Sequence, residues 1–188
     1  MVPHRDIQIT WHSISLLFKN QPPEDSDYYG PVKTTHGHLR AMEAIRASAD
    51  SPEAGNRDVF KLYWELGSRI HHDGERDFDL ADALSAVGLD TSFASAIDDE
   101  QWDPAIQAAM DDGLGLVGND VGTPIIAMKN SNGDRVGYFG PVINKIPRGD
   151  DALKMWDALT AMMDIDGFFE LKKTRTGGID FGHRPDPV

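Results

Sequence analysis

The feature that most constrains this chain is a long helical block in its first two thirds. From about Val32 to Gly118 the sequence carries helical spacings and capping residues, and it lacks the alternation of a strand. Within the block, an apolar stripe at i, i+3 and i+4 spacing indicates a helix that faces a core. The stripe consists of Val59, Phe60, Tyr63, Leu66 and Ile70. We therefore predict an all-helical region across this span.

Capping residues divide the block into separate helices. Asp79 precedes an apolar run as an N-cap, and Gly88 follows the run as a C-terminal stop. Asp103 is the predicted N-cap of a later helix, with Pro104 at its first position. Proline fits there because the first N–H of a helix has no partner within the helix. These signals predict one helix after Asp79 and another after Asp103.

A strand-like pattern precedes the block. Ile7, Ile9 and Trp11 alternate with polar residues, which predicts a strand over residues 6–12. The apolar residues that follow are predicted to be the end of this strand. They lead into a loop that contains Pro22.

The sequence after the block predicts a hairpin and a closing helix. Two short strands follow Pro124 and are separated by Asn132-Gly133, a dipeptide that favours hairpin turns. Proline has no N–H for a sheet ladder, so Pro124 marks a strand end, an edge or a special peptide geometry. A final helix is predicted from near Asp150. Its apolar stripe consists of Leu153, Trp156, Leu159 and Met163.

The composition is that of a soluble globular protein and narrows the range of partners. The 188 residues carry a formal net charge of −13, with a pI near 4.7. Such a charge repels a phosphate backbone and an anionic lipid surface, so nucleic acid and membranes are unlikely partners. No apolar run approaches the ~20 residues that span a bilayer, and the first residues lack the apolar region of a signal peptide. We expect a cytoplasmic protein.

The chain contains no cysteine. Disulfides, thiolate metal sites and a cysteine nucleophile are therefore excluded within these 188 residues.

Five stretches of the sequence resemble a known family of enzymes. They read ISLLFKN, ELGSRIHHDG, VGNDVGTPII, YFGPVINKIPRG and FFELKKTRT. Together they resemble the DsbA-like thioredoxin-fold oxidoreductases, and more narrowly the mycothiol-dependent nitroreductase branch. The combination of DVGTP with FGPV, IPRG and ELKKTRT is specific, and the resemblance extends from about Asp6 to Arg175.

The resemblance implies an α/β, thioredoxin-like fold of the DsbA type with a large all-helical insertion. The expected core comprises residues 1–30 and 119–171, the insertion comprises residues 31–118, and residues 172–188 form a polar C-terminal tail. The family's first strand and first helix have no counterpart in the sequence. These elements carry its Cys-Pro-Trp-Cys motif at a helix N-terminus, where the helix dipole lowers the pKa of the thiol.

Two explanations for the missing motif remain open. Either the stated start is internal to a longer protein, or the redox motif is naturally absent. A strand and a crossover helix need about 30 residues, whereas only five residues precede Asp6. We expect a truncated start, because without the first strand residues 6–12 would lack a parallel neighbour and leave backbone groups unpaired.

The resemblance also implies a pocket without a catalytic residue of its own. Thr123-Pro124 matches the cis-proline dipeptide of thioredoxin folds, which faces the thiol and lets adjacent backbone pair with an extended substrate. Val121, Gly122 and Asn20 are expected to line the same pocket, the amide of Asn20 orienting a ligand by hydrogen bonds. Three further residues are expected at the rim: Tyr28, Tyr29 and His71.

The implied function is thiol-disulfide oxidoreduction or mycothiol-dependent reduction. A cysteine thiolate would exchange with a low-molecular-weight thiol such as mycothiol, or would reduce a small electrophile. As given, the chain is expected to be inactive in thiol chemistry, so whether it is an enzyme stays open.

Two alternatives to this function also stay open. The first is a catalytically silent DsbA-like binding or dimerisation module, in which the unpaired sheet gap could promote a homodimer. The second and weaker one is a relative of the kappa-class glutathione transferases and isomerases, which use a serine. Ser13 and Ser15 are poor substitutes for that serine.

Four histidines lack the spacing of a zinc site, and adjacent histidines on a helix point to different faces. They are His36, His38, His71 and His72. We expect surface or loop positions for them and no metal site.

A basic cluster stands near the C-terminus of this acidic chain. It contains Lys172, Lys173 and Arg175. The cluster could attract an anionic group of a cofactor or neutralise acidic neighbours, and we favour the second interpretation.

Overall fold

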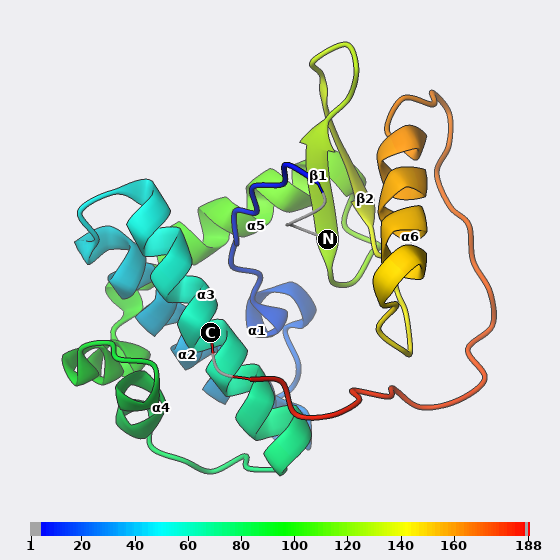
Figure 1. Cartoon of the computed structure of the whole chain (residues 1–188). Helices are drawn as coiled ribbons and strands as arrows, with labels where there is room; N and C mark the ends of the chain where they lie inside the picture. The colour runs from blue at the N-terminus through cyan, green and yellow to red at the C-terminus, as the bar shows by residue number, and fades with distance from the viewer. Residues whose placement is uncertain (1–4, 187) are drawn as a thin grey trace. The chain divides into compact units, whose positions relative to one another are not determined.

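The computed structural model describes residues 5–186 and 188, and the chain divides into two compact units. The helical unit comprises residues 10–111 and the C-terminal residues from His183 onward, and the hairpin unit comprises residues 5–9 and 112–182. The described residues are mostly helical, with one two-stranded sheet (Figure 1). None of the helices in this part of the chain has the length and apolar character needed to cross a membrane.

The predicted helical block is confirmed. Its helices are α2 (Tyr29–Ser48), α3 (Pro52–Ser68), α4 (Leu80–Ala86) and α5 (Asp103–Val117), and a short helix, α1 (Leu16–Asn20), precedes the block. A π-helical turn, η2 (Arg69–Asp73), extends α3, and two 3-10 segments, η3 (Thr91–Asp98) and η4 (Glu100–Trp102), precede α5. Helix α5 begins in the helical unit, and its last residues from Asp112 onward belong to the hairpin unit.

Capping side chains start α3 and α4 of the helical unit. Asp79 is the N-cap of α4, as predicted, and its carboxylate accepts a hydrogen bond from the N–H of Ala81. Ser51 caps α3 by accepting from the N–H of Ala54. Asp103 is the first residue of α5 rather than the residue before it, so α5 begins one residue earlier than predicted.

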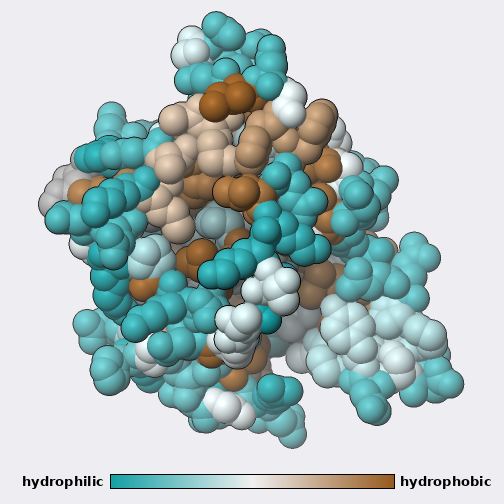
Figure 2. Space-filling view, turned by 90° about the vertical axis from the view of Figure 1, so that its right-hand side faces the viewer, coloured by the Kyte–Doolittle hydropathy of each residue, from teal (hydrophilic) through white to brown (hydrophobic). Residues whose placement is uncertain are grey.

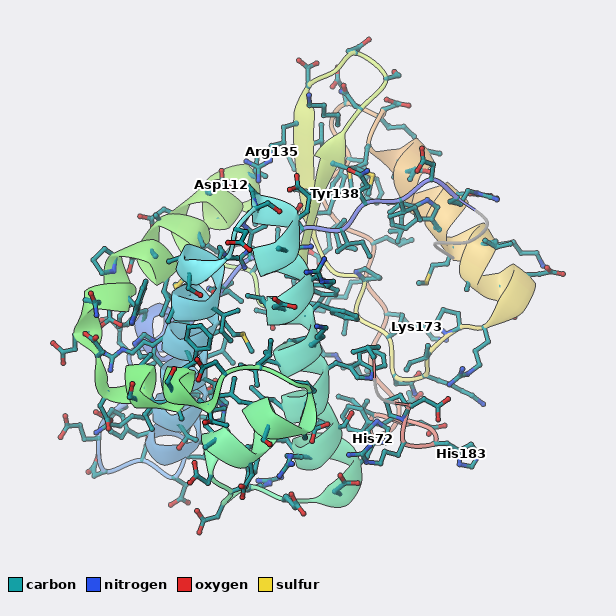
Figure 3. All side chains as sticks on the ribbon, turned by 60° about the vertical axis from the view of Figure 1, so that its left-hand side comes forward. His72, Asp112, Arg135, Tyr138, Lys173 and His183 are labelled. Carbon is teal, nitrogen blue, oxygen red and sulfur yellow. The ribbon has the colours of Figure 1, made fainter. Side chains whose placement is uncertain are left out.

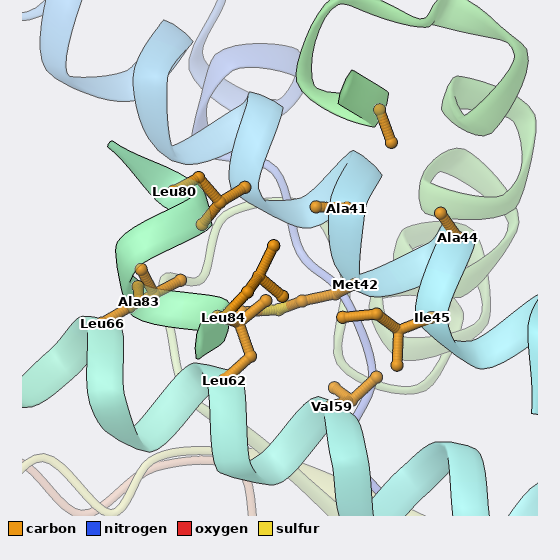
Figure 4. Packing of buried hydrophobic residues seen from close by; sticks show 11 residues of the cluster. Ala41, Met42, Ala44, Ile45, Val59, Leu62, Leu66, Leu80, Ala83 and Leu84 are labelled. Carbon is orange, nitrogen blue, oxygen red and sulfur yellow. The ribbon is translucent and has the colours of Figure 1, made fainter. Parts of the chain in front are cut away.

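The core of the helical unit lies where α2, α3, α4 and η3 meet. Figure 4 shows the aliphatic side chains that fill it, among them Leu62 and Leu84, which are fully buried. Each such leucine contributes about 1.5–3 kcal/mol to folding by leaving water. Val59 and Leu66 are buried as the stripe predicts, but Tyr63 is 52% exposed. The buried face of α3 therefore runs through Leu62, which the predicted stripe omitted.

The predicted strand over residues 6–12 is wrong. The N–H of Trp11 donates to Oδ1 of Asn56 at 2.8 Å, and Nη2 of Arg46 donates to the carbonyl oxygen of Trp11 at 2.7 Å. The indole of Trp11 stacks on Phe60 and Tyr63 of α3, with ring centroids 5.2 and 5.5 Å away. Side chains of α2 and α3 thus satisfy the two backbone groups of Trp11, which a neighbouring strand would otherwise have paired.

The predicted end of that strand is also wrong, because Leu16–Asn20 is helix α1. Ser15 is its N-cap, and Oγ of Ser15 accepts a hydrogen bond from the N–H of Phe18 at 3.1 Å. This bond satisfies one of the backbone donors that a helix start leaves unpaired. The capping hydrogen bond of Ser15 therefore favours a helix, although the apolar run that follows had indicated a strand.

The predicted hairpin is confirmed in the hairpin unit. Strand β1 (Ile125–Lys129) pairs antiparallel with β2 (Arg135–Phe139), in the register that places Ile125 opposite Phe139. Asn130 holds the turn, because its side-chain oxygen accepts from the N–H groups of Asn132 and Asp134. Gly133 has a φ of 86°, a value that glycine adopts readily.

Long-range contacts attach the other elements of this unit to the hairpin. A Cβ on Gly137 of β2 would lie 2.9 Å from Cβ of Leu116, so the end of α5 approaches the sheet closely at this glycine. Arg135 and Asp112 form a two-fold ion pair with both contacts at 2.6 Å (Figure 3). The N–H of Ser131 in the turn donates to Asp164, just after the last helix.

The predicted closing helix is α6 (Gly149–Met162), which lies beside β2 (Figure 1). Its predicted stripe is half-buried or buried, and Met163 is 4% exposed. Arg5 from the N-terminal segment forms a two-fold ion pair with Asp157 on its outer surface.

The hairpin unit buries few side chains. Among its described residues, only Ala152 and Met163 have side chains that are buried. Large apolar side chains stand open to solvent instead, and apolar residues are visible on the face seen in Figure 2. The large apolar residues of this unit that are exposed are Ile9, Phe139, Val142, Ile143, Ile146, Ile165, Phe169, Leu171 and Ile179. This unit therefore has the surface of an incompletely covered core.

Candidate functional site

The Thr123-Pro124 dipeptide lies in the hairpin unit, directly before β1. Its peptide bond is cis, and the carbonyl oxygen of Pro124 accepts a hydrogen bond from the N–H of Gly140 at 2.8 Å. Both Thr123 and Pro124 are exposed. The loop is therefore attached to the end of β2 and presents its outer side to solvent.

The backbone before Pro124 is open to a ligand. Gly122 and Thr123 form no hydrogen bond within the part of the chain that the structure describes. Gly122 lies against the ring of Phe139, where an added Cβ would come within 3.3 Å of Cε2. Val121 precedes it and is half-buried. An extended ligand can thus find free N–H and carbonyl groups at Gly122 and Thr123.

Asn20 and Tyr28 lie in the helical unit, and the structure brings these two predicted residues together. Asn20 ends α1 and Tyr28 immediately precedes α2, and Nδ2 of Asn20 donates to Oη of Tyr28 at 3.1 Å. The Tyr28 side chain is 43% exposed. This bond uses an amide hydrogen of Asn20 and the oxygen of Tyr28. The hydroxyl hydrogen of Tyr28 can therefore donate to a ligand, and the amide oxygen of Asn20 can accept from one.

The other two predicted rim residues have separate surroundings in the same unit. Oη of Tyr29 donates to Glu24 at 3.4 Å, and the ammonium of Lys33 lies 5.8 Å from the centre of the Tyr29 ring. His71 is exposed in the turn η2 that extends α3. Tyr29 and His71 are therefore weaker members of the predicted site than Asn20 and Tyr28.

A buried polar network lies beneath α1 and was not predicted. Oγ of Ser15 lies 2.9 Å from Nδ1 of His36, and Nε2 of His36 lies 3.1 Å from Oδ1 of Asp103. Arg40 completes the network with two hydrogen bonds to the same carboxylate, at 2.6 and 2.8 Å. The network therefore joins the start of α1 to α2 and to the start of α5.

The charges in this network are set by burial and by Arg40. Burial lowers the pKa of His36 below its usual value, the opposing effect of Asp103 being smaller. The hydrogen bond from Arg40 is the main cause that lowers the pKa of the Asp103 carboxyl. The arrangement is thus a neutral imidazole between a hydroxyl and an ion pair.

Ser15, His36 and Asp103 have the composition of a hydrolase triad but not its accessibility. The Ser15 side chain is 1% exposed and already accepts a hydrogen bond as the cap of α1. A nucleophile must reach a substrate, and this hydroxyl cannot. The network instead fixes α1 on α2 and so positions Asn20 at the end of α1.

Two of the histidine positions expected on the surface are wrong. His36 is 3% exposed and His38 is 9% exposed, because α2 is the central helix of the helical unit. His36 packs on Phe18 and His38 on Phe78, with ring centroids 4.4 and 5.9 Å apart. Burial lowers the pKa of His38 as well. In the described part of the chain, no group of three or more possible metal ligands occurs.

Ser13 belongs to a second buried network. Its hydroxyl donates to Oε1 of Glu43 at 2.6 Å, and Nε of Arg46 donates to Oε2 of the same carboxylate at 3.3 Å. Since Ser13 is 5% exposed, it holds residues 11–15 on α2 and does not present a nucleophile.

The predicted site residues therefore form two groups. Residues 121–124 lie in the hairpin unit, and Asn20, Tyr28, Tyr29 and His71 lie in the helical unit. The first group offers backbone hydrogen bonds, and the second offers an amide and a phenol. Neither group contains a cysteine, so neither can supply a thiolate.

Comparison with protein families gives a match over most of the chain. The model of a family described as "Rv2466c-like: Mycothiol-dependent nitroreductase Rv2466c" matches residues 2–173.

Proposed function

Because the chain belongs to the Rv2466c-like family of mycothiol-dependent nitroreductases, we propose that it binds a low-molecular-weight thiol or a small electrophile for thiol-dependent reduction. In this proposal the reacting thiolate comes from a segment outside the 188 residues. The chain itself binds and orients the reactants.

The observation that carries the proposal is the open backbone of the loop before β1. Gly122 and Thr123 keep their backbone hydrogen-bonding groups free among the described residues, while the carbonyl oxygen of Pro124 accepts from Gly140. In a thioredoxin-like fold this loop faces the thiol, and an extended ligand pairs with it. The hairpin followed by α6 supports such a core of the DsbA type, with the helices from α2 to α5 as its insertion.

The Asn20–Tyr28 pair supports a role in recognising the polar part of the ligand. Mycothiol-like thiols carry hydroxyl and amide groups, and a phenol beside an amide can both donate to and accept from them. Tyr29 and His71 would contribute at the rim.

The absence of cysteine defines what the chain does not supply. Oxidising two thiols to one disulfide releases two electrons and two protons, and a nitro group or a disulfide accepts them. A cysteine thiolate is needed to pass these electrons through mixed disulfides, and the sequence has none.

The second candidate function is a catalytically silent binding or dimerisation module of the same fold. The absence of cysteine agrees with this silent module as well as it agrees with a reductase whose thiolate lies outside the 188 residues. A transferase that uses a serine of this chain is disfavoured, since Ser13 and Ser15 are buried and hydrogen-bonded. The reading frame upstream of Met1 separates these functions. An in-frame Cys-Pro motif supports the reductase, a Ser-Pro motif the transferase, and no homologous segment the silent module.

The binding role predicts a specific effect of removing the polar pair. We expect isothermal titration calorimetry to show that the purified chain binds mycothiol. Asn20→Ala or Tyr28→Phe raises the dissociation constant by about three- to tenfold, which is the effect of losing one hydrogen bond.

The matched control is Tyr63→Phe, which removes a phenol hydroxyl from another exposed tyrosine of the same unit. This change leaves the affinity as it was. Equal affinities for all three variants and the original chain would remove Asn20 and Tyr28 from the site.

A further inference from the structure

The segment after α6 is an exposed arm with apolar and basic side chains. Residues 168–176 form neither helix nor strand, and we call them the basic arm. Phe169 is 88% exposed and Leu171 is 87% exposed, although both are large and apolar. In an extended chain alternate residues share one side, so Phe169, Leu171, Lys173 and Arg175 fall together.

The cations of the basic arm are available for a partner. Within the described residues, none of Lys172, Lys173 and Arg175 forms an ion pair or hydrogen bond, so no contact supports the expectation that they neutralise acidic neighbours. Figure 3 labels Lys173, which lies on the extended segment after α6. The basic arm therefore combines two unburied apolar side chains with three unpaired charges.

The helical unit contains a groove of complementary character. The groove has a volume of about 360 Å³ and lies between α2 and the segments η3 and η4. Ala44, Ala47 and Ala96 form its small apolar surface, and Phe93 and Trp102 are its aromatic walls. A space of this size and lining accepts one large apolar side chain.

The rim of the groove is acidic. Asp99 lines it, and Asp98 and Glu100 are its exposed sequence neighbours. The helical unit as a whole has nine Lys and Arg residues against twenty Asp and Glu, whereas the hairpin unit, which includes the arm, has nine against eleven. Most of the negative charge of the chain is therefore on the unit that contains the groove.

We propose that the groove of one copy binds the basic arm of a second copy. Phe169 or Leu171 fills the apolar space, and Lys173 and Arg175, which share that side of the arm, meet Asp98, Asp99 and Glu100 on the rim. Charge complementarity sets the direction in which the arm binds, because the acidic groups lie on the rim of the groove and the basic groups follow Phe169 and Leu171 in the arm. Each copy has one arm and one groove, so a reciprocal exchange closes a two-fold dimer.

The absence of cysteine permits a clean cross-linking test. Two single variants of the full chain are prepared, Ser95→Cys at the groove and Leu171→Cys in the arm, and they are mixed in equal amounts under mild oxidation. The proposal predicts that the mixed disulfide between the two variants exceeds both like-with-like dimers on a non-reducing gel. The control is Ser95→Cys mixed with Lys154→Cys, an exposed position on α6, which gives no such excess.

Charge exchange tests the same contact without cysteine. Sedimentation equilibrium of the original chain gives a dissociation constant for the dimer, and this constant rises with added salt because salt screens the charges. Lys173→Glu with Arg175→Glu, or Asp98→Lys with Glu100→Lys, raises this dissociation constant about tenfold. Mixing the two double variants restores association, because each reversed arm then meets a reversed groove.

Three results would overturn the proposal. A chain that stays monomeric at high concentration has no such dimer. A variant with both cysteines that cross-links only within one copy shows that the arm occupies its own groove. A dimer that survives both charge reversals and Phe169→Ala belongs to another surface, such as the free edge of β1.

Discussion

At the scale of single residues, the buried imidazole of His36 connects a serine and an aspartate that come from other helices or their caps. Its neighbours Ser15 and Asp103 are far from it in the chain, and only the packing of α1, α2 and α5 brings them within 2.9 and 3.1 Å. A histidine in a polar segment carries no local signal for such a network. Its role is to hold Asn20 in place through α1, not to react.

The buried histidines predict a pH dependence of stability. Because burial lowers the pKa of His36 and of His38 in the folded chain, the unfolded chain binds more protons as the pH falls through about 6.5. Their full contribution to the free energy of unfolding is present above that pH, and it is lost progressively below it. Urea unfolding at pH values from about 7.5 down to 5, above the range of the carboxylates, measures the slope.

His38→Gln separates the histidine effect from other titrations. The variant removes a ring whose pKa is lowered by burial alone, so its stability falls less steeply with pH than that of the original chain. Parallel curves for the two proteins would show that His38 titrates equally in the folded and unfolded states.

At the scale of elements, the sequence correctly predicted the features that are formed by residues close together in the chain. Asp79 is a cap within its own turn, and Asn132-Gly133 is a hairpin turn held by Asn130, so both were readable from a few residues. The alternation of Ile7, Ile9 and Trp11 was not sufficient, because a strand requires a neighbour. Residues of α2 and α3 bind Trp11 instead. The candidate site follows the same rule, since the loop at Pro124 had a local signal and the His36 network had none.

The contact between α5 and the hairpin predicts a large effect of one methyl group. Gly137→Ala places a Cβ 2.9 Å from Cβ of Leu116, neither of which is the end of a flexible side chain. Separating the helix from the sheet costs about 1–3 kcal/mol of unfolding free energy, measured by urea unfolding.

Gly115→Ala in α5 is the matched control for this contact. Its Cβ meets nothing within 4 Å, and alanine favours a helix over glycine by up to about 1 kcal/mol. The control is therefore as stable as the original chain or more stable. If Gly137→Ala were equally harmless, the close packing of α5 on β2 would be wrong.

At the scale of the whole molecule, the two units differ in how complete they are. The helical unit has a full aliphatic core, whereas the described part of the hairpin unit buries two side chains and exposes many apolar ones. The strands β1 and β2 pair only with each other in the described residues. A strand and a helix that carry a thiol would cover these surfaces and pair with the sheet. This agrees with the proposal that these residues bind the reactants while another segment supplies the thiolate.

The central claim is that these 188 residues bind the reactants of thiol-dependent reduction but do not supply the thiolate. The most direct measurement is the rate at which the purified chain reduces a nitroaromatic compound or a disulfide with mycothiol as the only reductant. The account predicts a rate equal to that of mycothiol alone, although calorimetry of the same sample shows that mycothiol binds. Turnover above that background, in a chain without cysteine, would contradict it.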